Sequence, residues 1–187
     1  MEQDTAIPLN FIDTGPRLEE AVRHLSRQTI IAADLEADSM FHFNEQVCLI
    51  QIASRDRIYI IDPLPITDMA PLKQLMEAAG IRKVFHGADY DVRSLYRDFN
   101  INIENLFDTE MASRFLGYAE TGLNALIRSH FGLLLEKKFQ KKDWSQRPLP
   151  EAMITYAADD VRYLIALSER LESELAARGR LEWVLEE

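Results

Sequence analysis

Three separated apolar stretches of this chain carry acidic side chains where a protein interior normally excludes them. The first, IIAADLEAD, contains Asp34 and Glu36; the second, VFHGADYDVRSL, contains Asp91; the third, ITYAADDVRYL, contains Tyr156 and Asp160. An unpaired buried carboxylate is costly, so something positive must compensate these acids. Because few basic residues stand beside them in the sequence, divalent metal ions are the simplest compensation.

Length and composition predict a single globular domain. With 187 residues, 47% of them apolar and 28% charged, the chain can bury one substantial core but not two large ones. The net charge of −10 argues against a generic polyanion-binding surface, so any contacts to nucleic acid must be local. The chain shows no leader region and no apolar run of about 18 residues, so neither export nor a membrane partner is expected. The single cysteine, Cys48, favours a buried thiol in a reducing, cytoplasmic setting.

Apolar runs bounded by turn residues predict strands, and the hydrophobic period then changes to that of helices. The expected strands are Thr29–Glu36, Val47–Ala53, Arg57–Ile61 and Lys83–His86. The expected helices are Pro71–Ala79, Tyr90–Phe99, a short one closing at Ser113–Gly117, Leu123–Phe131, a long one at Glu151–Arg178 and another starting at Arg180. The lysine-rich segment Leu133–Pro150 is expected to be a loop. This order predicts an α/β domain with a mixed central sheet flanked by helices.

The spacing of the acids predicts that they can share one site. Residues two apart on a strand project to the same face, so Asp34 and Glu36 present adjacent carboxylates. Residues four apart on a helix lie one turn apart, so Tyr156 and Asp160 form a second pair. Asp91 falls in the first turn after a strand, where active-site side chains often gather. Taken alone, the first pair more often marks a solvated strand end, and the second more often marks the boundary between surface and core on a helix. Together the acids suit two hard cations about 3.5–4 Å apart.

In this order the motifs resemble those of the DEDD exonuclease superfamily, and specifically the ribonuclease D group of its tyrosine-type branch. DLE at 34–36, HGADYD at 86–91 and YAADD at 156–160 are similar to its three motifs, and CLIQIA, FDTEMASRFLGY and KKDWSQRPL extend the resemblance over about residues 29–171. The resemblance implies a ribonuclease H-like exonuclease fold, two divalent metal ions (Mg²⁺ or Mn²⁺), and removal of nucleotides from 3′ ends as 5′-monophosphates. It also implies catalytic residues, namely the metal ligands Asp34, Glu36, Asp91 and Asp160, with Tyr156 orienting the attacking water.

Two of the three motifs contain a second aspartate. Aligning His86 with the family histidine selects Asp91 and leaves Asp89 as the expected N-cap of the following helix. The Tyr-to-Asp spacing selects Asp160 over Asp159, which should point about 100° away, toward solvent. His86 itself is expected to make a structural hydrogen bond rather than to bind a metal. The superfamily's other branch has a histidine just before the tyrosine position, where this chain has threonine, so the tyrosine branch is favoured.

One segment, EKKFQKKDW at 136–144, is both basic and aromatic, and Arg147 follows it. Its lysines could meet the phosphates of a single strand without sequence preference, although a solvated loop anchored by Trp144 explains the same residues. Apolar side chains that follow the first motif, including Phe43, could stack on terminal bases or pack as an ordinary apolar patch. The candidate nucleic-acid-binding residues are Met40, Phe41, Lys137, Lys138, Lys141 and Lys142.

We therefore expect residues 1–187 to form a single 3′-5′ exonuclease domain, with its core at about 29–178 and without the C-terminal helical (HRDC) domain that many group members carry. The expected reaction is two-metal hydrolysis at the 3′ end of single-stranded RNA, in RNA 3′-end processing or turnover. A 3′-5′ DNA exonuclease would share the same motifs. A noncatalytic nucleic-acid-binding module with a decayed site is the alternative from another class, and the complete set of five residues argues against it.

Overall fold

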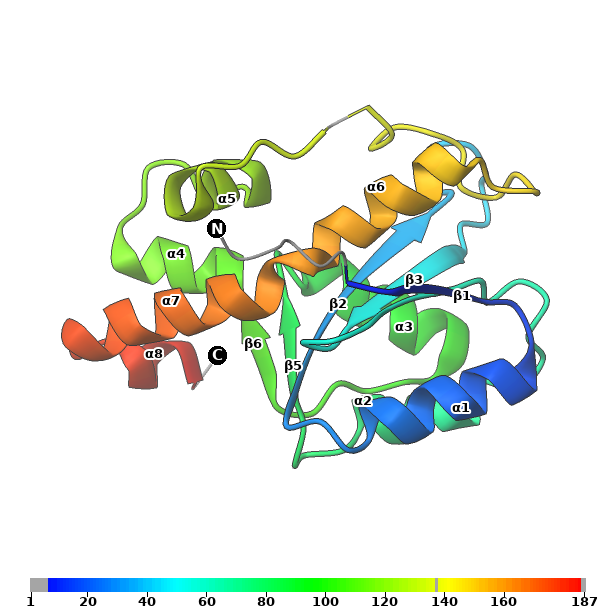
Figure 1. Ribbon diagram of the computed structural model, residues 1–187, viewed down its shortest axis with the longest axis horizontal. Helices are drawn as coiled ribbons and strands as arrows, with labels where there is room; N and C mark the ends of the chain where they lie inside the picture. The colour runs from blue at the N-terminus through cyan, green and yellow to red at the C-terminus, as the bar shows by residue number, and fades with distance from the viewer. Residues whose placement is uncertain (1–6, 137, 186–187) are drawn as a thin grey trace.

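The computed structural model describes residues 7–136 and 138–185, which form a mixed six-stranded sheet with helices on both faces (Figure 1). The strands are β1 (Leu9–Ile12), β2 (Ile30–Ala37), β3 (Val47–Ala53), β4 (Ile58–Ile61), β5 (Arg82–Phe85) and β6 (Leu106–Asp108). The helices are α1 (Gly15–Leu25), α2 (Ala70–Met76), α3 (Asp89–Phe99), α4 (Thr109–Leu116), α5 (Leu123–Phe131), α6 (Glu151–Arg162), α7 (Leu164–Ala177) and α8 (Leu181–Leu185). The predicted α/β class and mixed sheet are confirmed.

The strand order is β1-β4-β3-β2-β5-β6. Strand β2 runs antiparallel to β3 but parallel to β5, and β5 runs parallel to β6. Parallel strands end at the same edge of a sheet, so the segments that follow β2, β5 and β6 meet there. This shared edge receives the carboxylates of β2 and the first turns of α3 and α4.

The side chains of β2 alternate between two apolar cores. Ile31, Ala33 and Leu35 belong to the core that includes residues of α1, α2 and α3, whereas Ala32 belongs to the core built with α4 to α7. Figure 1 shows α1 and α6 on opposite sides of the strands. Because strand side chains alternate, Asp34 and Glu36 continue the row of Ala32 and face α6.

Three elements were not predicted. Strand β1 and helix α1 lie ahead of the expected core boundary at residue 29, and β6 has only three residues. Helix α1 buries Leu18, Ala21 and Leu25 on one face, a spacing that indicates a helix. Strands β1 and β6 are too short for alternation to reveal them, and they form where neighbouring strands supply hydrogen-bond partners.

Two helix predictions were wrong in detail. The long helix expected at residues 151–178 is interrupted at Tyr163, which separates α6 from α7. The local sequence has neither Gly nor Pro at this point, so tertiary packing decides the break. Asp89 is not the N-cap of α3; Ala88 holds that position, and the Asp89 carboxylate instead accepts a 2.6 Å hydrogen bond from Arg93.

Candidate active site and metal centre

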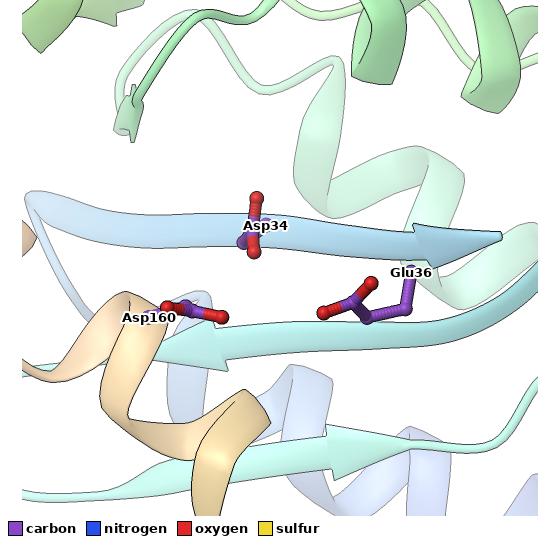
Figure 2. A group of neighbouring side chains, drawn as sticks. All are labelled: Asp34, Glu36 and Asp160. Carbon is purple, nitrogen blue, oxygen red and sulfur yellow. The ribbon is translucent and has the colours of Figure 1, made fainter. Parts of the chain in front are cut away.

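Three carboxylates from two elements converge at the sheet edge. Asp34 and Glu36 project from β2, and Asp160 projects toward them from α6 (Figure 2). One carboxylate oxygen from each of the three lies within 4.8 Å of the others. Asp34 and Glu36 lie together because they are two residues apart on one strand, and the packing of α6 on the sheet brings Asp160 to them. The predicted convergence of the first and third motifs is therefore confirmed.

Asp91 lies close to this cluster but outside the group whose oxygens fall within 4.8 Å. It sits in the first turn of α3 and is buried, with 6% of its surface exposed. Burial raises the pKa of both Asp91 and Glu36; the charge of Asp34 adds to the shift of Asp91, and the charge of Asp91 adds to that of Glu36. Asp91 therefore belongs to the same electrostatic cluster, on the side of the site where α3 begins.

The cluster strongly disfavours its own ionisation. Burial, followed by the charges of Asp34, Asp160 and Asp91, raises the pKa of Glu36 to about 10. Burial and the charge of Asp34 raise the pKa of Asp91 and of Asp160 to about 8. Burial also raises the pKa of Asp34, to about 6. Desolvated like charges held this close need a positive partner to be fully ionised at neutral pH.

A cavity of about 570 Å³ opens over the cluster. None of the described residues that line it is Lys or Arg. Six of them are acidic, namely Asp34, Glu36, Glu110, Glu120, Glu136 and Asp160. A larger cavity of about 720 Å³ lies beside α1 and β1, but the four arginines among its lining residues disfavour a cation there. The acidic cavity is therefore the candidate active site, and its oxygen-rich, cation-poor lining fits hard divalent metal ions.

Tyr156 completes the site from one turn before Asp160 on α6 and lines the same cavity. Its ring packs against Trp144 and edge-on against Phe139, both from the segment between α5 and α6. Burial, then the nearby charges of Asp160, Glu36 and Asp34, raises the pKa of the Tyr156 hydroxyl above its ordinary value. The phenol is therefore protonated at neutral pH.

The loop after β5 is fixed by the residues that follow β6. The Asp108 carboxylate accepts hydrogen bonds from the backbone N–H groups of Gly87 (2.9 Å) and Ala88 (2.8 Å) while it caps α4. His86 Nδ1 lies 2.9 Å from Thr109 Oγ1, so the structural hydrogen bond expected for His86 is present. Gly87 has φ +73°, a left-handed backbone conformation that favours glycine at this position.

Sequence reasoning missed Glu110 as a residue of the site. It lies in α4 directly after the strand end at Asp108, and its carboxylate lines the cavity while bonding Arg114 at 2.7 Å. The segment FDTE at 107–110 places two acids directly after an apolar residue, and this pattern could have pointed to Glu110 in the sequence. Asp159, by contrast, points away as predicted, with 40% of its side chain exposed and a 2.8 Å bond from Arg162.

The candidate nucleic-acid contacts lie on two exposed loops. Met40 is 68% and Phe41 48% exposed on the loop after β2. His42 Nε2 lies 3.2 Å from Ser145 Oγ, which links this loop to the lysine-bearing loop. Lys138, Lys141 and Lys142 are exposed there, and Lys137 lies outside the described residues. The single cysteine, Cys48, is buried as expected.

A mixed sheet with an acidic cluster at the edge where its parallel strands end defines the ribonuclease H-like exonuclease fold. The sequence profile described as "3′-5′ exonuclease" matches residues 9–176. The chain belongs to this 3′-5′ exonuclease family. Within its described part, no helix is long and apolar enough to cross a bilayer.

Several known proteins are similar to the chain. An exosome complex component 10 homologue of Caenorhabditis elegans is 40% identical over 169 residues, which cover 90% of this chain and 19% of that protein. The catalytic core of RRP6 from Trypanosoma brucei is 36% identical with a TM-score of 0.93, covering 97% of this chain and 50% of that one. Escherichia coli RNase D, described as an exoribonuclease involved in structured RNA processing, is 30% identical with a TM-score of 0.91, covering 95% and 48%. Brucella melitensis NrnC with bound Mg²⁺, at 24% identity and a TM-score of 0.81 over 95% of this chain and 86% of that one, shares the fold.

The chain spans about a fifth of the length of the curated relatives it matches. The similarity therefore concerns one portion of each of those relatives. The ribonuclease D resemblance inferred from the three motifs is confirmed by the family match and by the RRP6 and RNase D structures.

Proposed function

We propose that the chain is a two-metal 3′-5′ exoribonuclease that removes nucleotides from RNA 3′ ends as 5′-monophosphates, in RNA 3′-end processing or turnover. The observation that carries the proposal is the convergence of Asp34, Glu36 and Asp160 with Tyr156 in a cavity whose described lining lacks Lys and Arg. An RNA substrate is supported by the similarity to an RNase D described as an exoribonuclease.

Asp34, Glu36, Asp91 and Asp160 would hold the two divalent ions, Mg²⁺ or Mn²⁺, and Asp91 would complete the set from α3. Bound ions of this kind generate a nucleophilic hydroxide from water at neutral pH and stabilise the developing charge on the attacking and leaving oxygens. The mutual repulsion among the carboxylates supports this assignment. Burial and the neighbouring charges raise the pKa of Glu36 to about 10, and bound cations would offset the cost of ionising it.

Tyr156 would orient the attacking water through its hydroxyl rather than take a proton from it. The raised pKa of Tyr156 supports an orienting role over that of a base, because burial and the surrounding carboxylates keep the phenol protonated. A protonated phenol donates one hydrogen bond and accepts others, so it can fix a water beside the acidic cluster. The two aromatic rings packed against Tyr156 limit how far its own ring can turn.

The substrate would be held by single-strand contacts at the two exposed loops. Met40 and Phe41 would stack on bases near the 3′ end, and Lys137, Lys138, Lys141 and Lys142 would meet backbone phosphates. The hydrogen bond between His42 and Ser145 supports a common surface, because it joins the loop after β2, which carries Met40 and Phe41, to the loop before α6, which carries the lysines. Such a surface supplies local positive charge on a chain of net charge −10.

The testing experiment is degradation of 3′-labelled and 5′-labelled single-stranded RNA, duplex RNA and DNA, with Mg²⁺, Mn²⁺ or chelator. We expect metal-dependent release of 5′-mononucleotides from the 3′ end of single-stranded RNA. Preferential degradation of DNA would favour a DNA exonuclease. Binding of RNA without metal-dependent turnover would favour a noncatalytic module. The cytoplasmic setting and the single-domain organisation predicted from the sequence stay predictions.

A further inference from the structure

The orientation of Tyr156 depends on a segment outside its own helix. Trp144 packs on the Tyr156 ring with centroids 6.2 Å apart and planes tilted by 34°, and Phe139 meets it edge-on at 5.8 Å. Both aromatic side chains come from the segment 133–150 that joins α5 to α6. Trp144 is 1% exposed and Tyr156 half-buried, so this packing restricts how far the Tyr156 ring can turn.

Arg147 anchors this segment with all five of its N–H donors. Its Nε donates to Asp62 Oδ2 at 2.5 Å, and its Nη2 donates to Asp62 Oδ1 and to the Cys48 carbonyl, both at 2.8 Å. Its Nη1 donates to the carbonyls of Trp144 at 2.7 Å and Gln146 at 2.8 Å. One guanidinium therefore ties the backbone of Trp144 to the start of β3 and to the residue that follows β4.

The Trp144 indole Nε1 is buried and has no hydrogen-bond partner among the described residues. Apolar packing in the core therefore holds the Trp144 side chain, and Arg147 holds its backbone carbonyl. The pair is bidentate, and its Asp62 carboxylate is 5% exposed while the Arg147 side chain is 27% exposed. Such a pair constrains geometry more tightly than an exposed one.

We propose that Arg147 is a positioning residue for the reaction. It fixes Trp144 against the Tyr156 ring and thereby holds the Tyr156 hydroxyl beside the acidic cluster. The inference rests on the proposed role of Tyr156 in orienting the attacking water. A displacement of about 1 Å at a reacting group can cost about 100-fold in rate, so loss of this anchor should reduce kcat without removing any metal ligand.

The variants must separate positioning from folding. Arg147→Met alone leaves Asp62 as a buried unpaired charge and can unfold the protein. The paired substitution Asp62→Leu/Arg147→Met replaces the ion pair with apolar groups of similar volume, which proteins often tolerate, while it removes the bond to the Trp144 carbonyl. Arg147→Lys keeps the charge but cannot span both carboxylate oxygens and three carbonyls, so it should restore only part of kcat. Arg23→Met, at an exposed arginine of α1, is the matched control and should leave kcat unchanged.

The decisive measurement is kcat in a double-mutant cycle with Tyr156→Phe. We expect the paired substitution to lower kcat by about 10- to 100-fold when Tyr156 is present. It should change kcat by less than about twofold in the Tyr156→Phe background, because Arg147 then has no hydroxyl to position. Equal losses in both backgrounds would show a general structural role and would overturn the proposal.

A spectroscopic measurement gives a readout independent of catalysis. In Trp183→Phe protein, Trp144 is the remaining tryptophan, and its emission should shift to the red when the paired substitution loosens it. An unchanged emission would overturn the proposal. A large effect of Tyr156→Phe on kcat without an effect of the Arg147 variants would overturn this inference alone. Unchanged kcat in Tyr156→Phe itself would overturn the role assigned to Tyr156 and this inference with it.

Discussion

Asp34 of β2 and Asp160 of α6 bring carboxylate oxygens within 4.8 Å of each other, although more than half the chain separates them in sequence. Two acids at this distance repel unless one is protonated or a cation lies between them. The fold therefore places a destabilising pair at the edge of its own sheet. That arrangement supports a site built for metal ions, and the behaviour of each acid can be tested separately.

Asp34→Asn and Asp160→Asn should each abolish turnover while the fold stays intact, because each removes a charged ligand from the site. The metal-free variants should melt at a temperature equal to or above that of the wild-type chain, since each loses one repelling charge. Rates under saturating Mg²⁺ and thermal melts in chelator check this. Asp159→Asn is the neighbouring control, because that side chain faces away and bonds Arg162. Near-wild-type turnover in either of the first two variants would contradict the ligand assignment.

Tyr156→Phe should lower kcat by roughly 10²- to 10⁴-fold, the range typical of a positioned group that handles a proton. Metal affinity should change little, because the phenol orients water and is not assigned as a ligand. Single-turnover rates together with calorimetric titration of Mn²⁺ separate the two effects. Loss of a bound metal ion in this variant would show that Tyr156 coordinates it directly.

Metal-free protein should lose stability as pH rises through the neutral range. Glu36 has an ordinary pKa of 4.5, and burial with neighbouring charges raises it to about 10 in the folded state. Between these two values the folded state binds more protons than the unfolded state, so the free energy of unfolding falls as pH rises. Asp91 and Asp160, raised from 3.8 to about 8, act in the same direction.

The corresponding measurement is the melting temperature from pH 5.5 to pH 8.5 in chelator and in Mg²⁺. We expect a downward slope in chelator, a smaller slope for Glu36→Gln, and a higher melting temperature with Mg²⁺ at the upper end, because bound cations stabilise the ionised folded state. A melting temperature in chelator that rises steadily across this range would contradict the raised pKa values.

Changing Lys137, Lys138, Lys141 and Lys142 together to Ala should raise KM for single-stranded RNA and flatten its salt dependence. Each lost phosphate contact should remove roughly 0.7 from the slope of log affinity against log salt concentration. The kcat at saturation should change less, because metal ions at the acidic cluster, and not these lysines, would stabilise the reacting phosphate. Steady-state kinetics across a salt series tests this. An unchanged KM and slope would mean that the loop only connects α5 to α6.

The sequence by itself determined the alternation that puts Asp34 and Glu36 on one face of the strand. It also determined the helical spacing that places Tyr156 one turn before Asp160. These are local periodicities, set by backbone geometry within a few residues. The motifs were sufficient to predict the α/β class and the fold family. Sequence also favoured Asp91 over Asp89, and the structure places Asp91, buried, within the electrostatic reach of Asp34.

Only the tertiary structure decided which distant groups meet. The short strands β1 and β6 exist because neighbouring strands pair with them, and the break at Tyr163 has no local cause in the sequence. Glu110 enters the cavity because β6 ends at the same edge as β5. Arg147 reaches Asp62 across the fold by a bond that no sequence spacing reveals. Long-range pairing depends on the summed packing of the whole chain, and a single sequence shows only its local part.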